Sequence, residues 1–252
     1  MNSIYFLLFL FSLFVVGAVA IHIISRKKEK PGKINAWKKF FVYFFIIYSI
    51  FLCILYVPVL FRVVCFLVAI GGAFEIVRLQ LKSYQPLAKS KFSLYFSTYV
   101  ALATLFLFFA FENVEIQILV VFAVCTFDAF SQLSGQLFGK RKIAPRISPN
   151  KTLGGLVGGA CSALILGVIA NCILAGGCLD GARHDGLLVA IILILCVVVA
   201  SFVGDLLASY VKRQYAVKDY GSLLPGHGGI LDRFDSLIVA GAVMFLLKFI
   251  GL

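Results

Sequence analysis

Residues 209–235 read SYVKRQYAVKDYGSLLPGHGGILDRFD, a polar island between two long apolar runs. Pro225-Gly226 and Gly228-Gly229 predict a turn whose backbone can approach a ligand closely. Asp232 and Asp235 follow at the start of the last apolar run, where a helix would carry both carboxylates on one face. Cations and paired carboxylates beside such a turn are what a phosphate and metal site needs. The remaining charged residues and the one histidine of the stretch are Lys212, Arg213, Lys218, Asp219, His227 and Arg233.

A simpler interpretation is that this stretch is only the basic flank of a membrane helix, which sets its orientation. That interpretation accounts for Lys212 and Arg213. It does not account for Asp232 and Asp235, because an ionisable group costs about 2.5–3.5 kcal/mol near the centre of a membrane helix. We therefore expect both Asp side chains to face protein or water rather than lipid.

Composition places the chain in the membrane. Of its 252 residues, 62% are hydrophobic and only 13% are charged. Several apolar runs reach about 18 residues, the length that spans a hydrocarbon core as a helix. The predicted fold is an all-α polytopic integral membrane protein. The net charge of +12 lies in the loops between runs and gives no nucleic-acid signal, and the seven cysteines show no metal-type spacing.

About eight transmembrane helices are expected, in one membrane domain. Residues 1–115 supply the N-terminal helices, and residues 116–252 form a C-terminal region that carries the polar motifs. In the third run, Glu75 and Arg78 are spaced to pair. The runs lie near 4–24, 40–56, 59–78, 92–111, 116–134, 153–175, 187–207 and 230–250.

The basic residues predict the topology. Of 23 Lys and Arg, 20 fall in or beside four alternate loops, and such loops are cytoplasmic. Both termini are then outside. The four loops span 26–39, 78–91, 140–151 and 212–233.

Further polar groups lie near the same predicted membrane face. Asp128 stands in the fifth run within reach of the next loop, and Asp205 ends the seventh. The loop 135–152 holds five cations and no acid; Thr152 is suited to cap the next helix, with Pro149 in its first turn. The glycines at 154, 155, 158 and 159 favour close helix packing over phosphate binding.

Together these groups suit a reaction between phosphates. Asp128, Asp205, Asp232 and Asp235 offer hard oxygen ligands to Mg²⁺, which is usually held by one or two carboxylates and substrate phosphates. Loop cations would bind a polyphosphate and spread the charge developing at phosphorus. A site at the membrane surface suits a nucleotide on one side and a lipid phosphate on the other.

Residues 209–235 resemble the signature of the phosphatidate cytidylyltransferase family, also called CDP-diacylglycerol synthases. The signature runs S-x-apolar-K-R, four residues, K-D-x-small, then P-x-H-G-G-apolar-x-D-R-apolar-D, and every position is met. The resemblance covers the C-terminal half, whereas the N-terminal half is similar only in being membrane helices. Upstream matches are Asp128, FGK at Phe138–Lys140, SPNKT at Ser148–Thr152 and GDL at Gly204–Leu206.

The resemblance implies that CTP and phosphatidic acid react with Mg²⁺ to give CDP-diacylglycerol and pyrophosphate, on the cytoplasmic face of the inner membrane. Family members can be dimers, and the glycine face at 154–159 is compatible with a homodimer. Asp205, Asp232 and Asp235 would hold the metal and, with Lys212 and Arg213, form the catalytic set. Substrate-binding residues would be Asp128, Lys140, Ser148, Lys151, Thr152, Lys218, His227 and Arg233.

Two positions depart from the family pattern, which often has Glu where this chain has Gly154 and Ala208. Restoring Glu at 208 is expected to be tolerated at a wet helix end. The departures leave room for a divergent CTP-dependent enzyme with another lipid substrate, or for a non-catalytic membrane scaffold. A transporter is a further alternative. It would be expected to place its carboxylates near the midplane on broken, repeated helices, whereas here they lie near one membrane face.

Overall fold

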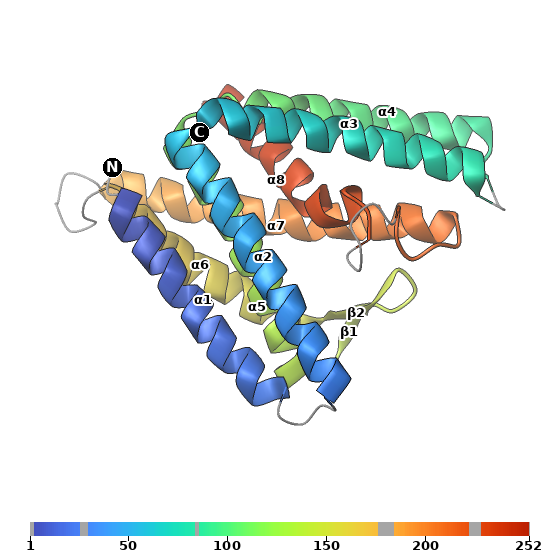
Figure 1. Cartoon of the computed structure of the whole chain (residues 1–252). Helices are drawn as coiled ribbons and strands as arrows, with labels where there is room; N and C mark the ends of the chain where they lie inside the picture. Colours follow the sequence, from blue (N-terminus) through green and yellow to red (C-terminus); the bar gives the residue numbers. More distant parts are fainter. Residues whose placement is uncertain (1–2, 26–29, 84–85, 176–183, 222–227, 252) are drawn as a thin grey trace.

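Each apolar run folds as a helix, because the backbone N–H and C=O groups of a single segment in lipid can form all their hydrogen bonds only within a helix. The computed structural model describes residues 3–25, 30–83, 86–175, 184–221 and 228–251. Within them the chain forms eight helices and one short hairpin (Figure 1). The helices are α1 Ser3–Ser25, α2 Lys30–Tyr56, α3 Pro58–Lys82, α4 Lys89–Phe109, α5 Val114–Phe138, α6 Leu153–Ala175, α7 His184–Gln214 and α8 Leu231–Phe249.

The predicted class, an all-α polytopic membrane protein, is confirmed. Five helices in the described residues are long and apolar enough to cross a membrane: α3, α4, α5, α6 and the Leu187–Gln214 part of α7. The C-terminal ends of α1, α3, α5 and α7 point to the side of the molecule where the hairpin lies, and those of α2, α4, α6 and α8 point to the opposite side (Figure 1). The exact number of crossings stays a prediction.

Helix boundaries extend beyond the predicted apolar runs. α2 begins at Lys30, so most of the loop expected before residue 40 is helical, and α7 continues to Gln214. Apolar content marks where lipid ends, whereas a helix continues into water while its backbone bonds are made within it. The extension of α7 places Lys212 and Arg213 on a helix rather than in a loop.

The hairpin was not predicted. β1 (Lys142–Ala144) pairs antiparallel with β2 (Ser148–Thr152) in the stretch expected to be loop. Pro149 therefore lies in β2, and its predicted place in the first turn of α6 is wrong. The expected cap is confirmed, because the Gly155 N–H donates to Thr152 Oγ1 at 3.1 Å.

Glycines of α6 pack against α5 in the same chain, as the small-residue pattern predicted. A Cβ on Gly154 would lie 2.9 Å from the Phe138 carbonyl oxygen, and one on Gly159 would lie 2.9 Å from that of Phe127. The face that was compatible with a dimer partner is therefore occupied by α5.

The two halves of the sequence are packed together. α3 and α4 contact α8, α2 contacts α5, and α1 contacts α6. In Figure 1, α3 and α4 lie side by side along one edge and α8 runs between them and α7. Helices from the N-terminal region thus reach the elements that carry the polar motifs.

Candidate active site

The close approach of α7 and α8 brings two predicted carboxylates together. A Cβ on Gly204 would lie 2.9 Å from Val239 Cβ and 3.1 Å from the Asp235 carbonyl oxygen, so only glycine fits without a shift. Asp205, the next residue on α7, and Asp235 on α8 come within electrostatic reach of each other. Asp235 is buried, with 8% of its surface exposed.

The other predicted carboxylates join this cluster. Asp128 of α5 is within electrostatic reach of Asp235 and Asp205, and Asp232 is within reach of Asp235. Carboxylates from three helices therefore lie near one another where α5, α7 and α8 meet, and their role in a reaction stays a prediction.

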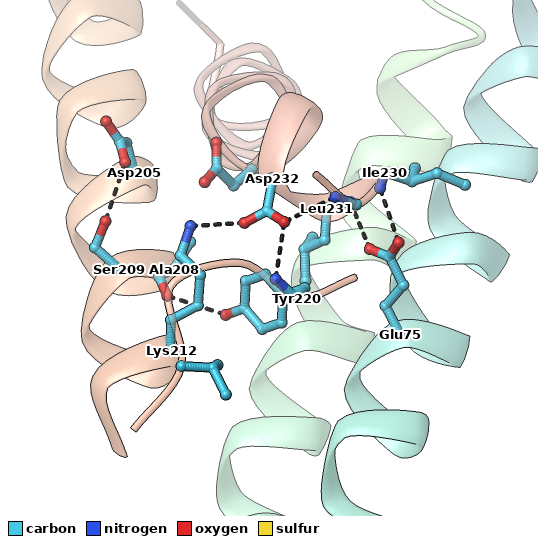
Figure 2. Close-up of polar contacts among 12 residues, drawn as sticks. Glu75, Asp205, Ala208, Ser209, Lys212, Tyr220, Ile230, Leu231 and Asp232 are labelled. Carbon is cyan, nitrogen blue, oxygen red and sulfur yellow. Dashed lines mark hydrogen bonds and ion pairs between the residues drawn. The ribbon is translucent and has the colours of Figure 1, made fainter. Parts of the chain in front are cut away.

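Lys151 links the hairpin to this cluster. Its Nζ lies 2.8 Å from Asp205 Oδ2 and 4.4 Å from the centre of the Phe202 ring. Ser209 donates its hydroxyl to the other Asp205 oxygen at 3.3 Å (Figure 2). β2 thus places the Lys151 ammonium group beside α7, although Lys151 stands 54 residues before Asp205 in the chain.

Asp232 is engaged by three donors from two sides (Figure 2). Lys212 Nζ lies 2.8 Å from Oδ1, which makes a largely buried ion pair. The backbone N–H groups of Tyr220 and Gly229 donate to Oδ2 at 2.8 and 2.9 Å. Asp232, in the first turn of α8, therefore connects that turn both to the loop before α8 and to α7.

Tyr220 stays a neutral donor in this site. Its hydroxyl donates to the Ala208 carbonyl at 3.1 Å, and Lys212 Nζ lies 5.3 Å from its ring centre. Burial, followed by the negative charges of Asp235 and Asp232, raises the pKa of Tyr220 well above its ordinary value. Desolvation and nearby like charge both disfavour a phenolate.

Glu75 of α3 belongs to this site, although sequence reasoning paired it with Arg78. That pairing is wrong: both Glu75 oxygens accept backbone N–H groups at the start of α8, from Ile230 and Leu231, each at 2.9 Å (Figure 2). A carboxylate inside an apolar run was the available signal, because such groups need a specific partner.

Other predicted residues lie at the edges of the cluster. Lys140, Lys218 and Arg233 are exposed, and Ser148 opposes Ala144 in the hairpin. Arg213 donates to the carbonyls of Ile147 and Val217, at 3.2 and 2.9 Å, and so holds the hairpin to the end of α7. Arg233 contacts the hydroxyl and ring of Tyr43. His227 lies outside the described residues.

The carboxylates suit Mg²⁺ in their chemistry. Asp128, Asp205 and Asp235 offer hard oxygens, and Lys151 is the cation that pairs with Asp205. Among the described residues, no group of three or more His, Cys, Asp or Glu is already arranged to hold a metal. Mg²⁺ in proteins is usually held by one or two carboxylates together with substrate phosphates, and its binding to this chain stays a prediction.

Comparisons with known proteins agree with the motif. A sequence model of the cytidylyltransferase family matches residues 1–250. Phosphatidate cytidylyltransferase of Brucella abortus is 42% identical over 119 residues, which cover 47% of this chain and 41% of that protein. The enzyme of the same name from Rickettsia felis is 39% identical over 121 residues, 48% and 53% of the two chains. An uncharacterized protein of Escherichia coli, YnbB, is 42% identical over 118 residues, 47% and 37%. Each match spans about half of the relative or less.

Proposed function

The chain belongs to the cytidylyltransferase family, and on that premise we propose that it transfers CMP from CTP to phosphatidic acid. The products are CDP-diacylglycerol and pyrophosphate, and the activity serves phospholipid biosynthesis. The partners are the two substrates and the lipid bilayer, and no nucleic acid is involved.

One observation carries this proposal: two Lys–Asp pairs, Lys151–Asp205 and Lys212–Asp232, flank the buried Asp235. Lysine ammonium groups are point-charge binders of phosphate. When the phosphates of CTP arrive, each Lys exchanges its carboxylate partner for a phosphate oxygen. The carboxylates released by this exchange become available where the negative charge of the substrate is concentrated.

Asp205 and Asp235 would hold a Mg²⁺ ion, with Asp232 as the third predicted ligand. Bound there, Mg²⁺ would neutralise the polyphosphate and polarise the reacting phosphorus. Lys151 and Lys212 would stabilise the charge that develops on the transferred phosphoryl group and on the leaving pyrophosphate.

The lipid phosphate needs little activation by the protein. A phosphate monoester has a second pKa of about 6 and is largely a dianion at neutral pH. Tyr220 is an unsuitable base, because burial and neighbouring carboxylates keep its phenol protonated. The residues of the site would instead align the two substrates, since correct orientation alone removes a large part of such a barrier.

The site would face the cytoplasm on the inner membrane. It lies where the C-terminal ends of α5 and α7 meet the hairpin (Figure 1), and these segments carry Lys140, Arg141, Lys142 and Arg146. Basic loops of this kind are retained on the cytoplasmic side.

A second acceptor lipid is favoured by Ala208, which stands where the resemblance implies Glu. Ala208 is buried against Tyr220, four residues before Lys212. A missing carboxylate there changes the charge around Lys212, so a lipid with a different phosphate head group is the alternative substrate.

Incubation of the purified full chain, in lipid nanodiscs, with labelled CTP tests the proposal. Phosphatidic acid with Mg²⁺ should give a labelled liponucleotide, and omission of either should abolish it. Product formation only with another phospholipid would identify a divergent enzyme. Binding of CTP with no liponucleotide from any phosphorylated lipid would indicate a non-catalytic membrane protein and overturn the proposal.

A further inference from the structure

Glu75 is a buried carboxylate that the proposed reaction does not use. Only 1% of its surface is exposed. In the described part of the chain, none of the ion pairs involves it. Its two oxygens instead accept the N–H groups of Ile230 and Leu231, one each at 2.9 Å. A buried charge is tolerated only when it is matched in this way.

The two N–H groups belong to the start of α8. The first N–H groups of a helix have no partner within it and form the positive end of its dipole. Ile230, which precedes α8, has no side chain that can cap them. Glu75 lies 155 positions earlier than Ile230 and supplies both acceptors from α3.

Glycines on both sides give the contact its shape. A Cβ on Gly229 would lie 2.5 and 2.6 Å from the two Glu75 oxygens, and one on Gly221 would lie 2.9 Å from Oε1. On α3, a Cβ on Gly71 would lie 2.7 Å from Ile230 Cδ1. The start of α8 therefore fits against α3 in one position, with the carboxylate between them.

This position sets where the site carboxylates project. Asp232 follows Leu231 directly, and its Oδ2 accepts the N–H of Gly229 at 2.9 Å. We infer that Glu75 is a positioning residue: it fixes the first turn of α8 and thereby aims Asp232 at Lys212 and Asp235 at Asp205. This inference rests on the proposed function, because the orientation of Asp232 and Asp235 matters only if they take part in CMP transfer.

Glu75→Gln keeps the shape of the side chain and removes its charge. The two N–H groups bind separate oxygens, and glutamine replaces one of those oxygens with an NH2 donor, so one N–H group loses its acceptor. Backbone hydrogen exchange should accelerate at Ile230 or Leu231 by roughly tenfold, the effect of losing one charge-assisted bond. In CMP transfer, kcat should fall by about ten- to a hundredfold, while the KM for CTP changes little. Glu112→Gln is the matched control, because Glu112 pairs with Lys248 at the opposite end of α8.

A second variant approaches the same contact from the other side. Gly229 has no positive φ, so Gly229→Ala brings no backbone strain but pushes a methyl group into the carboxylate. It should lower kcat as Glu75→Gln does. In a Glu75→Ala background the methyl group has room, so the double variant should be no worse than Glu75→Ala alone.

The two readouts separate this inference from the proposed function. If Glu75 were purely structural, Glu75→Gln would lower thermal stability but leave kcat per folded molecule unchanged, and the effects of Gly229→Ala and Glu75→Ala would be additive. That result would overturn the inference. Unchanged exchange at Ile230 and Leu231 overturns it as well. If the wild-type chain performs no CMP transfer, the proposed function fails, and faster exchange together with non-additive stability still establishes that Glu75 fixes the start of α8.

Discussion

At the scale of single residues, the two acids at the start of α8 differ in their surroundings. Asp232 accepts from Lys212 and two backbone N–H groups. Asp235 is buried and accepts the N–H of Ser236 at 2.7 Å, with Asp205 and Asp232 as negative neighbours. Their contributions to stability should therefore have opposite signs, although both belong to the proposed metal centre.

Asp232→Asn and Asp235→Asn should each reduce CMP transfer by at least about a hundredfold, the effect of removing one preorganised charge-stabilising group. The double variant should be little worse than either, because both residues would act through the one proposed phosphate-metal centre. Glu115→Gln, at the exposed far end of α5, is the control. Near-normal turnover of both variants at saturating Mg²⁺ would rule out the metal assignment.

Thermal unfolding of the same variants, without Mg²⁺, tests the difference in surroundings. Asp232→Asn should destabilise by about 1–3 kcal/mol, because Lys212 loses its buried partner. Asp235→Asn should be neutral or stabilising, because it removes like-charge repulsion inside the site. Equal losses in both variants would mean that the repulsion around Asp235 is already relieved.

Tyr220 gives a pH prediction with a definite sign. Its pKa is raised in the folded chain, so the unfolded chain loses the phenolic proton first, at about pH 10. The contribution of the neutral phenol is complete below that pH and is lost as pH rises toward the folded pKa. Tyr220→Phe should therefore lose less stability than the wild type between neutral pH and pH above about 10, as measured by thermal unfolding. A parallel decline would show that Tyr220 ionises as it does in water.

The sequence spacing predicted where Asp232 and Asp235 lie, whereas their catalytic role stays a prediction. Asp232 and Asp235 share the first turns of α8, and the apolar runs on both sides force α7 and α8 to meet near Gly204. Glu75 was not found, because its partners are backbone groups 155 and 156 positions away. Backbone donors carry no sequence signature. A carboxylate that binds them is therefore assigned, from the sequence alone, to the nearest cation in the chain.

At the scale of elements, the hairpin was missed for a similar reason. Residues 142–152 lack the alternation that marks a strand, and the segment contains two prolines. The hairpin is held by contacts outside itself: Arg213 of α7 donates to the Ile147 carbonyl, and Lys151 pairs with Asp205 on α7. The site therefore depends on tertiary contacts that local propensity does not encode.

Ala208→Glu tests how the end of α7 is organised. The expected wet helix end is wrong, since Ala208 is 8% exposed. We still expect the variant to fold, because a Glu four residues before Lys212 has the favourable orientation for an ion pair. That pair would draw Lys212 from Asp232, so the Mg²⁺ concentration for half-maximal activity should fall. An unchanged Mg²⁺ response in an active variant would exclude competition for Lys212.

Gly154→Glu is the contrasting change on α6. Its Cβ would lie 2.9 Å from the Phe138 carbonyl oxygen and 3.1 Å from the carbonyl carbon, both backbone atoms that cannot rotate away. Overpacking of this kind costs about 1–3 kcal/mol. Gly154→Ala should show most of that loss in a thermal unfolding experiment, whereas Val157→Ala on the exposed face should show little. Equal stability of the two alanine variants would mean that α5 and α6 can separate at this point.

At the scale of the whole molecule, charge and hydropathy predict the order of helices but not their packing. Eight apolar runs became eight helices in the described residues. The placement of α3 and α4 against α8 depends on fitted surfaces, such as Gly241 against Phe106 and Phe109. Each of those surfaces is apolar on both sides, so their complementarity is a matter of shape rather than composition.

The proposed placement of the site on the cytoplasmic face can be tested by a labelling experiment. Arg146 is exposed in the hairpin beside the site, and Asn113 is exposed between α4 and α5. The structure orients the hairpin and the α4–α5 connection toward opposite sides of the molecule (Figure 1), so alternate crossings place them in different compartments. In a background without native cysteines, Arg146→Cys should react with an impermeant reagent only after the membrane is opened, and Asn113→Cys should react in intact cells. Labelling of Arg146→Cys in intact cells would place the basic hairpin and its carboxylate cluster outside, away from any cytoplasmic nucleotide, and would contradict both the topology and the use of CTP.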